Sequence, residues 1–196
     1  MDVYLHPFRT HMKYIDVLLR SKKTVFSNED LKFLFQISNR NTLKSLLSRL
    51  VKNGILLHPS SWIYTFPHSD DLEFAVHLKK KSYISFETVL KQKSIIFQDY
   101  GNTIFLASDK TISKSVFWKC FEYHKLKDTL LLNPMGITQT GTYAIASPER
   151  AVCDRLYLSP NYYFDNIDPL NAEKLLQIAK IYNQRVVLSV KKILNA

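Results

Sequence analysis

The chain has 196 residues, of which 46% are hydrophobic and 13% aromatic, and its formal net charge at pH 7 is +10. This composition predicts one good domain or two small ones, and no stretch approaches the roughly 18 apolar residues that a membrane-spanning helix needs. The start of the chain lacks the apolar centre of a signal peptide, so we expect a cytoplasmic protein. Cys120 and Cys153 are too few for a disulfide scaffold and lack zinc-ligand spacing, so they are expected to be buried free thiols.

The positive charge is unevenly distributed along the sequence. Up to Phe66 there are ten lysines and arginines against four aspartates and glutamates, a net charge of +6. From Pro67 onward the counts are seventeen and thirteen, a net charge of +4. A basic field of this kind attracts polyanions, so nucleic acid is the expected partner, although a membrane surface or an acidic protein would also suit the charge.

The first part of the chain predicts short helices around a short strand. A first helix is expected from Arg9 to Arg20, followed by the basic pair Lys22-Lys23. Its apolar positions follow a helical period: Met12, Ile15, Leu18 and Leu19. Val25-Phe26 is strand-like, and Ser27 followed by Asp30 resembles a capping box that would start a second helix.

A third helix is the best-marked element of the sequence. Its apolar positions fall at i, i+3, i+4 and i+7, which form one helical stripe: Leu43, Leu46, Leu47 and Leu50. Ser38 is the expected N-cap, and Asn53-Gly54 supplies the left-handed residue at which a helix stops. The runs ILLH and WIYTF, joined by Pro59-Ser60-Ser61, predict a hairpin after it. This order of elements within residues 1–66 is typical of a winged helix-turn-helix domain.

The rest of the chain predicts a second domain at residues 72–196. The polar segment Pro67–Asp71 is the expected linker between the two domains. A helix is expected over Leu72–Lys80, and Ser85 is expected to cap another.

Strand-like runs and then helices follow in the second domain. From Thr103 to Ala146 the runs TIFLAS, SVFWKCFEYHKL, TLLL, GITQ and TYAIA predict an antiparallel sheet of four or five strands. Ser147 and Pro148 predict a helix that runs to about Tyr157, and two more helices are expected after it. The expected fold class is therefore α+β, with a winged helix-turn-helix followed by a mixed α/β domain.

Few residues are arranged for catalysis. The segment Gly136–Gly141 has the outer glycines of a phosphate loop but lacks its lysine, so a turn between two strands is expected there. Four charged residues near the start of the Ser147 helix could serve metal or phosphate chemistry: Glu149, Arg150, Asp154 and Arg155. Helix-start electrostatics and local ion pairs explain them better, so we expect no enzyme, catalytic residue, metal or cofactor. A nuclease that uses Glu149 and Asp154 is the enzymatic alternative.

Three segments resemble the AbiEi family, the antitoxin regulators of abortive-infection (type IV) toxin–antitoxin systems: SYISFETVL at Ser82–Leu90, FEYHKL at Phe121–Leu126 and above all YAIASPERAVCDRLYL at Tyr143–Leu158. Arg150 stands where that family usually has lysine, and Arg155 stands where it has an apolar residue. The resemblance implies a winged-helix repressor that binds inverted repeats in its own operon. It also implies a C-terminal domain that counteracts a cognate nucleotidyltransferase toxin in phage defence.

The expected DNA contacts lie on the third helix, just after the first helix and in the hairpin. Four side chains are expected nearest to base edges in the major groove: Arg40, Asn41, Lys44 and Ser45. Phosphate contacts are expected from Arg49, Lys52, Lys22 and Lys23, and backbone or minor-groove contacts from Ser60 and Ser61. The alternatives to a repressor with a toxin are a solitary winged-helix regulator and a protein-interaction module without a toxin.

Overall fold

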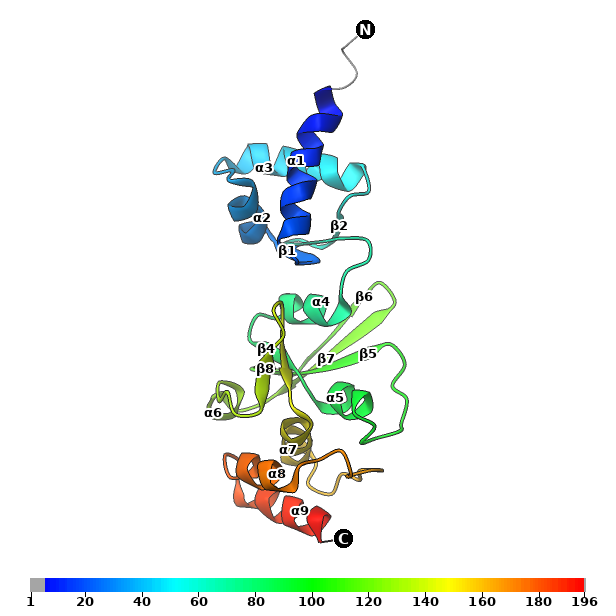
Figure 1. Cartoon of the computed structure of the whole chain (residues 1–196), viewed down its shortest axis with the longest axis vertical. Helices are drawn as coiled ribbons and strands as arrows, with labels where there is room; N and C mark the ends of the chain where they lie inside the picture. The colour runs from blue at the N-terminus through cyan, green and yellow to red at the C-terminus, as the bar shows by residue number, and fades with distance from the viewer. Residues whose placement is uncertain (1–5, 196) are drawn as a thin grey trace. The chain divides into compact units, whose positions relative to one another are not determined.

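The structure is a computed structural model that describes residues 6–195, with side chains from Met12 onward. The chain divides into two compact units, Met1–Leu78 and Lys79–Ala196, here called the N-terminal unit and the C-terminal unit. Figure 1 shows the elements of each unit along the chain. No helix in the described part of the chain is long and apolar enough to cross a bilayer.

The N-terminal unit combines helices with a small antiparallel sheet of strand order β1-β3-β2. Its helices are α1 (His6–Arg20), α2 (Asn28–Phe35), α3 (Arg40–Lys52) and α4 (Asp71–Leu78). Its strands are β1 (Val25–Ser27), β2 (Leu57–Ser60) and β3 (Ile63–Thr65). The predicted capping box at the start of α2 is confirmed, because Ser27 Oγ accepts from the Asp30 amide at 3.1 Å and Asp30 Oδ2 accepts from the Ser27 amide at 2.9 Å.

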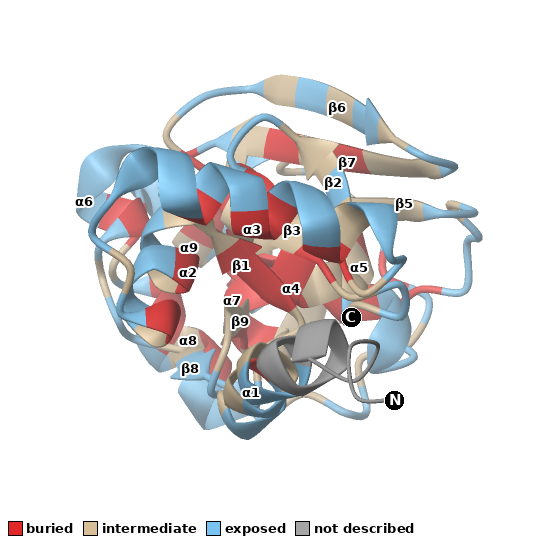
Figure 2. Cartoon of the chain, turned by 90° about the horizontal axis from the view of Figure 1, so that it is seen from above, coloured by how far each residue is buried: buried red, intermediate tan, exposed pale blue. Residues whose placement is uncertain are grey.

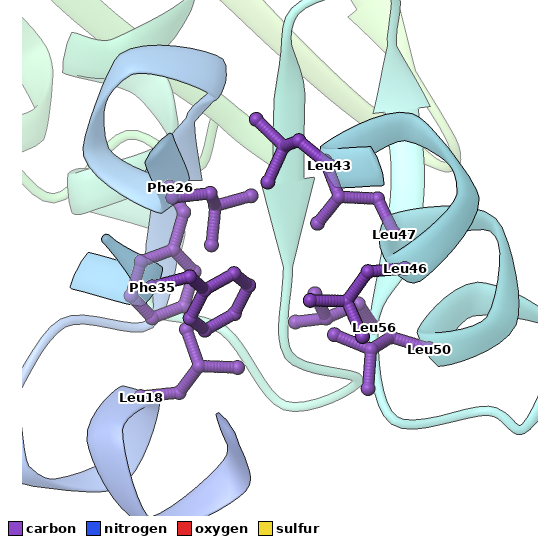
Figure 3. Packing of buried hydrophobic residues seen from close by; sticks show 9 residues of the cluster. Leu18, Phe26, Phe35, Leu43, Leu46, Leu47, Leu50 and Leu56 are labelled. Atoms are coloured by element: carbon purple, nitrogen blue, oxygen red, sulfur yellow. The ribbon is translucent and has the colours of Figure 1, made fainter. Parts of the chain in front are cut away.

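The core of the N-terminal unit joins α1, β1, α2, α3 and the segment that leads into β2 (Figure 3). Its buried members are Leu18, Phe26, Leu31, Phe35, Leu43, Leu46, Leu47, Leu50 and Leu56. The predicted leucine stripe of α3 is thus confirmed, and each fully buried leucine contributes about 1.5–3 kcal/mol.

The predicted stripe of α1 is only partly right. Met12 and Leu19 are 62% and 61% exposed, whereas Tyr14 and Val17 pack against the core beside Leu18. At about 100° per residue, Leu19 falls on the same side of the helix as Met12, away from Tyr14 and Val17. The face that carries Tyr14 and Leu18, four residues apart, is the one that is buried.

The expected linker belongs to the N-terminal unit, because α4 packs against β1 and β3. Glu73 is almost completely buried and accepts hydrogen bonds from the amide and the hydroxyl of Thr24, at 2.9 and 2.6 Å. The Asp70 amide donates to Thr24 Oγ1 at 2.9 Å. The boundary therefore lies after Leu78, and the prediction that the second domain starts at residue 72 is wrong.

The C-terminal unit is built on a six-stranded sheet of order β6-β7-β5-β4-β9-β8. Its strands are β4 (Ser82–Ile84), β5 (Thr103–Ser108), β6 (Ile112–Val116), β7 (Lys119–Lys125), β8 (Ile137–Gln139) and β9 (Ala144–Ala146). Its helices are α5 (Phe86–Gln92), α6 (Asp128–Leu131), α7 (Pro148–Leu158), α8 (Ala172–Ala179) and α9 (Gln184–Leu194). The α+β class of the chain is confirmed.

The sheet has six strands instead of the predicted four or five, and it differs from the prediction in three further respects. It is mixed, since β5 pairs in parallel with β7 and β4 in parallel with β9. The run SVFWKCFEYHKL is a hairpin that turns at Phe117-Trp118, not one strand. The run TLLL forms α6, in which Leu130 and Leu131 are buried, because a short apolar run fits a buried helix turn as well as a strand.

The helices of the C-terminal unit form successive layers on the sheet. Helix α5 packs on β5, α7 packs on α5, and α8 and α9 pack on α7 and on each other. The predicted cap of α7 is confirmed, since Ser147 Oγ accepts from the Arg150 amide at 3.2 Å. Both cysteines are free, as expected, but Cys153 is buried whereas Cys120 is half-buried.

Candidate nucleic-acid interface

Helix α3 presents a polar face on the side opposite its leucine stripe. Figure 2 shows its buried residues turned toward the strands of the N-terminal unit and its exposed residues turned outward. The six side chains that the sequence assigned to DNA on this helix are all exposed: Arg40, Asn41, Lys44, Ser45, Arg49 and Lys52. The helix begins one residue later than expected, because Asn39, not Ser38, is the N-cap and accepts from the amides of Asn41 and Thr42.

The exposed face of α3 divides into a centre and two flanks. Successive residues of an α-helix are about 100° apart, so Asn41 and Ser45 project from the middle of the exposed arc. Arg40 and Lys44 lie on one flank, and Arg49 lies on the other. Only the first of these flanks faces another part of the unit.

That flank forms one wall of an open groove of about 740 Å³. Its polar lining comes from α2, the loop before α3, α3 itself and the β2–β3 hairpin: Asn28, Glu29, Lys32, Ser38, Arg40, Asn41, Lys44, His58, Ser61 and Tyr64. The groove thus brings together Arg40, Asn41, Lys44 and Ser61 from the predicted set. It does not include the other predicted residues.

The groove also contains side chains that the sequence did not single out for binding. Lys32 comes from α2, and the rings of His58 and Tyr64 stack with centroids 4.3 Å apart and planes 12° apart. Partial burial raises the pKa of Tyr64, so this phenol stays neutral and can donate a hydrogen bond. The outward position of Lys32 follows from the periodicity of α2, but its proximity to α3 depends on tertiary packing.

The cations of the groove are available to an anion. The structure gives no carboxylate partner to Lys32, Arg40 or Lys44 within residues 12–195. Glu29 lies in the same groove and reduces its positive charge. On the far flank, Arg49 Nε donates to the carbonyl of Ser45 on its own helix.

The two lysines after α1 differ in their surroundings. Lys22 is exposed and has a left-handed φ of 57° at the end of the helix. The Lys23 ammonium lies 2.7 Å from Asp30 Oδ1 and therefore already pairs with the carboxylate of the α2 capping box. Lys23 thus contributes to the local structure, and of the two predicted phosphate contacts only Lys22 has an exposed side chain.

The hairpin turns one residue later than expected. Ser60 is the last residue of β2 and pairs with Ile63, so Ser61 and Trp62 form the turn. Ser60 is half-buried, whereas Ser61 is exposed at the tip and lines the groove. Of the two predicted hairpin contacts, only Ser61 is placed to reach a ligand.

The four charged residues at the start of α7 are engaged inside the C-terminal unit. Arg150 and Asp154 are fully buried, and Arg150 Nε lies 3.3 Å from Asp154 Oδ1. Tyr83, Ser85 and Tyr182 donate hydroxyl hydrogen bonds to the same carboxylate at 2.9, 2.7 and 2.5 Å. Ser85 therefore binds Asp154 instead of capping α5 as expected.

The two terminal nitrogens of the Arg150 guanidinium bind the end of α6 and the loop after it through hydrogen bonds. They donate to the carbonyls of Leu130, Met135 and Asn133 at 2.7, 3.0 and 3.4 Å and to the Tyr83 hydroxyl at 3.0 Å. Complete burial raises the pKa of Asp154, and the Arg150 charge and the three hydroxyls oppose that rise. This network thus gives hydrogen-bond partners to both members of the buried ion pair.

Glu149 and Arg155 also have internal partners. Glu149 accepts from the Asn171 amide at the start of α8 and lies 3.1 Å from the Lys174 ammonium. Arg155 lies 3.2 Å from Glu87 and 4.5 Å above the ring of Tyr162. No group of acidic, histidine or cysteine side chains suited to a metal ion occurs in residues 12–195.

Gly136 and Gly141 flank strand β8, so the turn predicted for this segment is only partly right: it lies at residues 140–143, between β8 and β9. Strand β8 starts directly after Gly136, and the chain turns at Gly141 before β9. A Cβ atom on Gly136 would lie 2.8 Å from Ile178 Cδ1 and 2.9 Å from Arg150 Cβ. This glycine therefore permits close packing against α7 and α8.

Comparisons with known proteins give a fold neighbour but no family. No family model matches the chain, and no curated protein matches it. Among solved structures, the chain is similar to the crystal structure of the Rv2827c protein from Mycobacterium tuberculosis, with a TM-score of 0.52 and 12% sequence identity. The match covers 92% of this chain and 74% of that chain. At this identity the likeness concerns the fold alone, and it supports a mixed α+β architecture.

Proposed function

We propose that the N-terminal unit is a winged helix-turn-helix domain that binds double-stranded operator DNA, and that the protein is a transcriptional repressor. The observation that carries this proposal is the exposed face of α3, with unpaired Arg40 and Lys44 beside a groove that reaches the β2–β3 hairpin. An α-helix fits the major groove of B-DNA, and the hairpin after it has the position of a wing.

The contacts of the proposed complex follow from the centre and flanks of α3. Asn41 and Ser45, at the centre, would face base edges, where an asparagine can pair with adenine through two hydrogen bonds. Arg40, Lys44 and Lys32 would hold the phosphates of the strand that passes through the groove. This division moves Arg40 and Lys44 from base contacts to phosphate contacts.

The antitoxin role is a second part of the proposal and rests on the resemblance to the AbiEi family. Under it, the protein represses its own toxin–antitoxin operon through inverted repeats and counteracts a nucleotidyltransferase toxin. The contacts of Glu149, Arg150, Asp154 and Arg155 give the motif in α7 a structural role in the C-terminal unit. They also weigh against the nuclease alternative, because its two carboxylates are engaged.

A mobility-shift titration with the DNA upstream of the protein's own coding sequence tests DNA binding. The double variant Arg40→Ala and Lys44→Ala should bind at least tenfold more weakly and should lower the slope of log K against log salt by about 2, since each phosphate contact contributes about 0.9. The matched control is Lys191→Ala with Lys192→Ala, two exposed lysines of α9 that remove the same charge from the other unit. Equal affinity and slope for the two double variants would refute the proposed interface.

Coexpression with a nucleotidyltransferase encoded beside this gene tests the antitoxin role. The Arg40→Ala and Lys44→Ala variant should lose repression but still rescue growth, because the antitoxin role is assigned to the C-terminal unit. Absence of rescue by the unaltered chain would leave a solitary regulator.

A protein-interaction module is the second candidate, and one observation favours it. Phe33 on α2 is 83% exposed and borders an apolar hollow with Leu34 and Ile37. Large exposed aromatic side chains are common at protein interfaces. Such binding would change little with salt and would be weakened by Phe33→Ser, whereas DNA binding would weaken steeply as salt rises.

A further inference from the structure

The hairpin of β6 and β7 in the C-terminal unit ends in two exposed aromatic side chains. Val116 pairs with Lys119, so Phe117 and Trp118 alone form the turn. Their side chains are 62% and 74% exposed. The hairpin lies at the edge of the six-stranded sheet, with β6 as the outermost strand (Figure 1).

Neither burial nor backbone preference accounts for Phe117 at this position. Its φ is +55°, whereas Trp118 is not among the residues with positive φ. A two-residue hairpin turn with positive φ only at its first central residue normally has glycine there. A bulky side chain in this conformation is an outlier, and backbone strain of this kind gathers at functional sites. The phenylalanine at this position therefore strains the turn.

The hairpin carries lysines at both of its ends. Lys119 follows the turn directly and Lys114 lies three residues before Phe117, whereas Lys110, Lys125 and Lys127 lie at the opposite end of the hairpin. Glu122 accepts a hydrogen bond from Ser113 of the same hairpin at 2.6 Å. The whole C-terminal unit has seventeen lysines and arginines against ten aspartates and glutamates, a net charge of +7. The hairpin thus belongs to the more positive of the two units.

We propose that the β6–β7 hairpin binds unpaired nucleic acid, with bases stacked on Phe117 and Trp118 and phosphates held by the lysines of the hairpin. The two rings are 5.8 Å apart and inclined by 42°, so they are not stacked on each other and each can offer a face to a base. Proteins that bind single strands without sequence preference commonly stack the bases on aromatic side chains within a positively charged surface.

An anionic membrane surface suits the hairpin less well. Interfacial binding depends on a continuous apolar face that enters the lipid headgroups. Here only Phe117 and Trp118 are exposed at the tip, and the exposed residues next to them on β6, Ser115 and Ser113, are polar. The proposal does not depend on the role of α3, because it concerns a different unit and a different form of nucleic acid.

Tryptophan fluorescence can isolate this hairpin. The chain has two tryptophans, and Trp62→Phe leaves Trp118 as the only reporter. Arg40→Ala with Lys44→Ala in the same protein removes the proposed duplex-binding face of α3. Addition of a 20-mer of dT or of U should quench Trp118 fluorescence, and the quenching should reverse at high salt.

Affinity is measured by anisotropy of the labelled 20-mers with two further variants in the Trp62→Phe background. Trp118→Ser should weaken binding at least tenfold, and Phe117→Gly should do the same while keeping or raising the thermal midpoint, because glycine suits this turn. Tyr163→Ser is the control, since Tyr163 is 78% exposed in a different loop of the same unit.

Three outcomes would overturn the proposal. They are an unchanged Trp118 signal with both 20-mers, equal affinity in Trp118→Ser and Tyr163→Ser, or quenching by phosphatidylserine vesicles in place of the 20-mers. If the unaltered chain does not bind operator DNA, the proposed role of α3 is refuted, but the 20-mer binding by the β6–β7 hairpin is unaffected.

Discussion

Replacing Asp154 by asparagine tests whether the buried network of α7 holds the C-terminal unit together. The substitution keeps the shape of the side chain but removes the charge that faces Arg150. Asparagine has one acceptor oxygen, whereas the carboxylate accepts from Arg150, Tyr83, Ser85 and Tyr182. The variant therefore leaves a fully buried guanidinium without its counterion and at least one buried hydroxyl without its acceptor.

The size of the effect follows from the burial of both partners. Removing one partner of a buried ion pair costs about 3–5 kcal/mol. The C-terminal unit spans Lys79–Ala196. An unfolding entropy of about 2.1 cal/mol/K per residue gives about 0.25 kcal/mol/K for this unit. The thermal midpoint of this unit should therefore fall by about 12–20 °C.

Circular dichroism during heating measures this change, and Asp168→Asn is the matched control. Asp168 is exposed, so the same chemical change should alter stability by no more than about 0.5 kcal/mol. If Asp154→Asn lowers the midpoint no more than Asp168→Asn does, the network does not stabilise the unit, and the structural role given to this motif is wrong.

Two further predictions concern a glycine and a capping carboxylate. Gly136→Ala places a Cβ 2.8 Å from Ile178 Cδ1 at a φ of +75°, whereas the Cβ of Gly141→Ala meets nothing within 4 Å. Gly136→Ala should therefore destabilise the C-terminal unit by about 1–3 kcal/mol more than Gly141→Ala does. Urea unfolding measures the loss of stability in both variants. Burial raises the pKa of Asp30, but the hydrogen bonds from Lys23 and Ser27 outweigh it, so the folded pKa is lowered. The stability that Asp30 contributes should therefore be fully present above the unfolded pKa of about 3.9 and lost as the pH falls through the folded pKa. The difference in unfolding free energy between the unaltered chain and Asp30→Asn should shrink between pH 5 and pH 2, and a constant difference would contradict this.

The local elements of the fold could be predicted because their causes lie within a few residues. The capping box of Ser27 and Asp30, the cap at Ser147 and the stop at Gly54 are interactions between residues at most four positions apart, and all three occur in the structure. The leucine stripe of α3 depends only on helical spacing. In these cases the sequence contains the whole interaction.

The errors concern contacts between residues far apart in the sequence. Thr24 and Glu73 are separated by 49 positions, and nothing near Glu73 indicates that α4 is attached to β1. The parallel pairing of β5 with β7 is also a contact between distant segments. Strand propensity could not predict it, because propensity does not determine the direction of the neighbouring strand. A polar segment therefore suggested a linker, and a row of short strands suggested an antiparallel sheet.

In the candidate DNA site, too, the residues of one helix could be predicted and the contribution of a second element could not. Arg40, Asn41, Lys44 and Ser45 could be assigned because they lie on the polar face of one amphipathic helix. Lys32 could not be assigned to the site, because it enters the groove from another element.

The unit boundary changes what the charge of the chain indicates. Asp70, Asp71 and Glu73 belong to the N-terminal unit, which therefore has ten lysines and arginines against seven aspartates and glutamates, a net charge of +3. The C-terminal unit has +7, so the basic excess is not concentrated where the proposed DNA-binding helix lies. What favours DNA binding by α3 is the local arrangement of unpaired cations, since charges are screened beyond about 8 Å at physiological salt. A salt dependence measured on the whole chain sums the contributions of both units. Only the difference between the α3 double variant and the α9 double variant reports on the proposed operator contact.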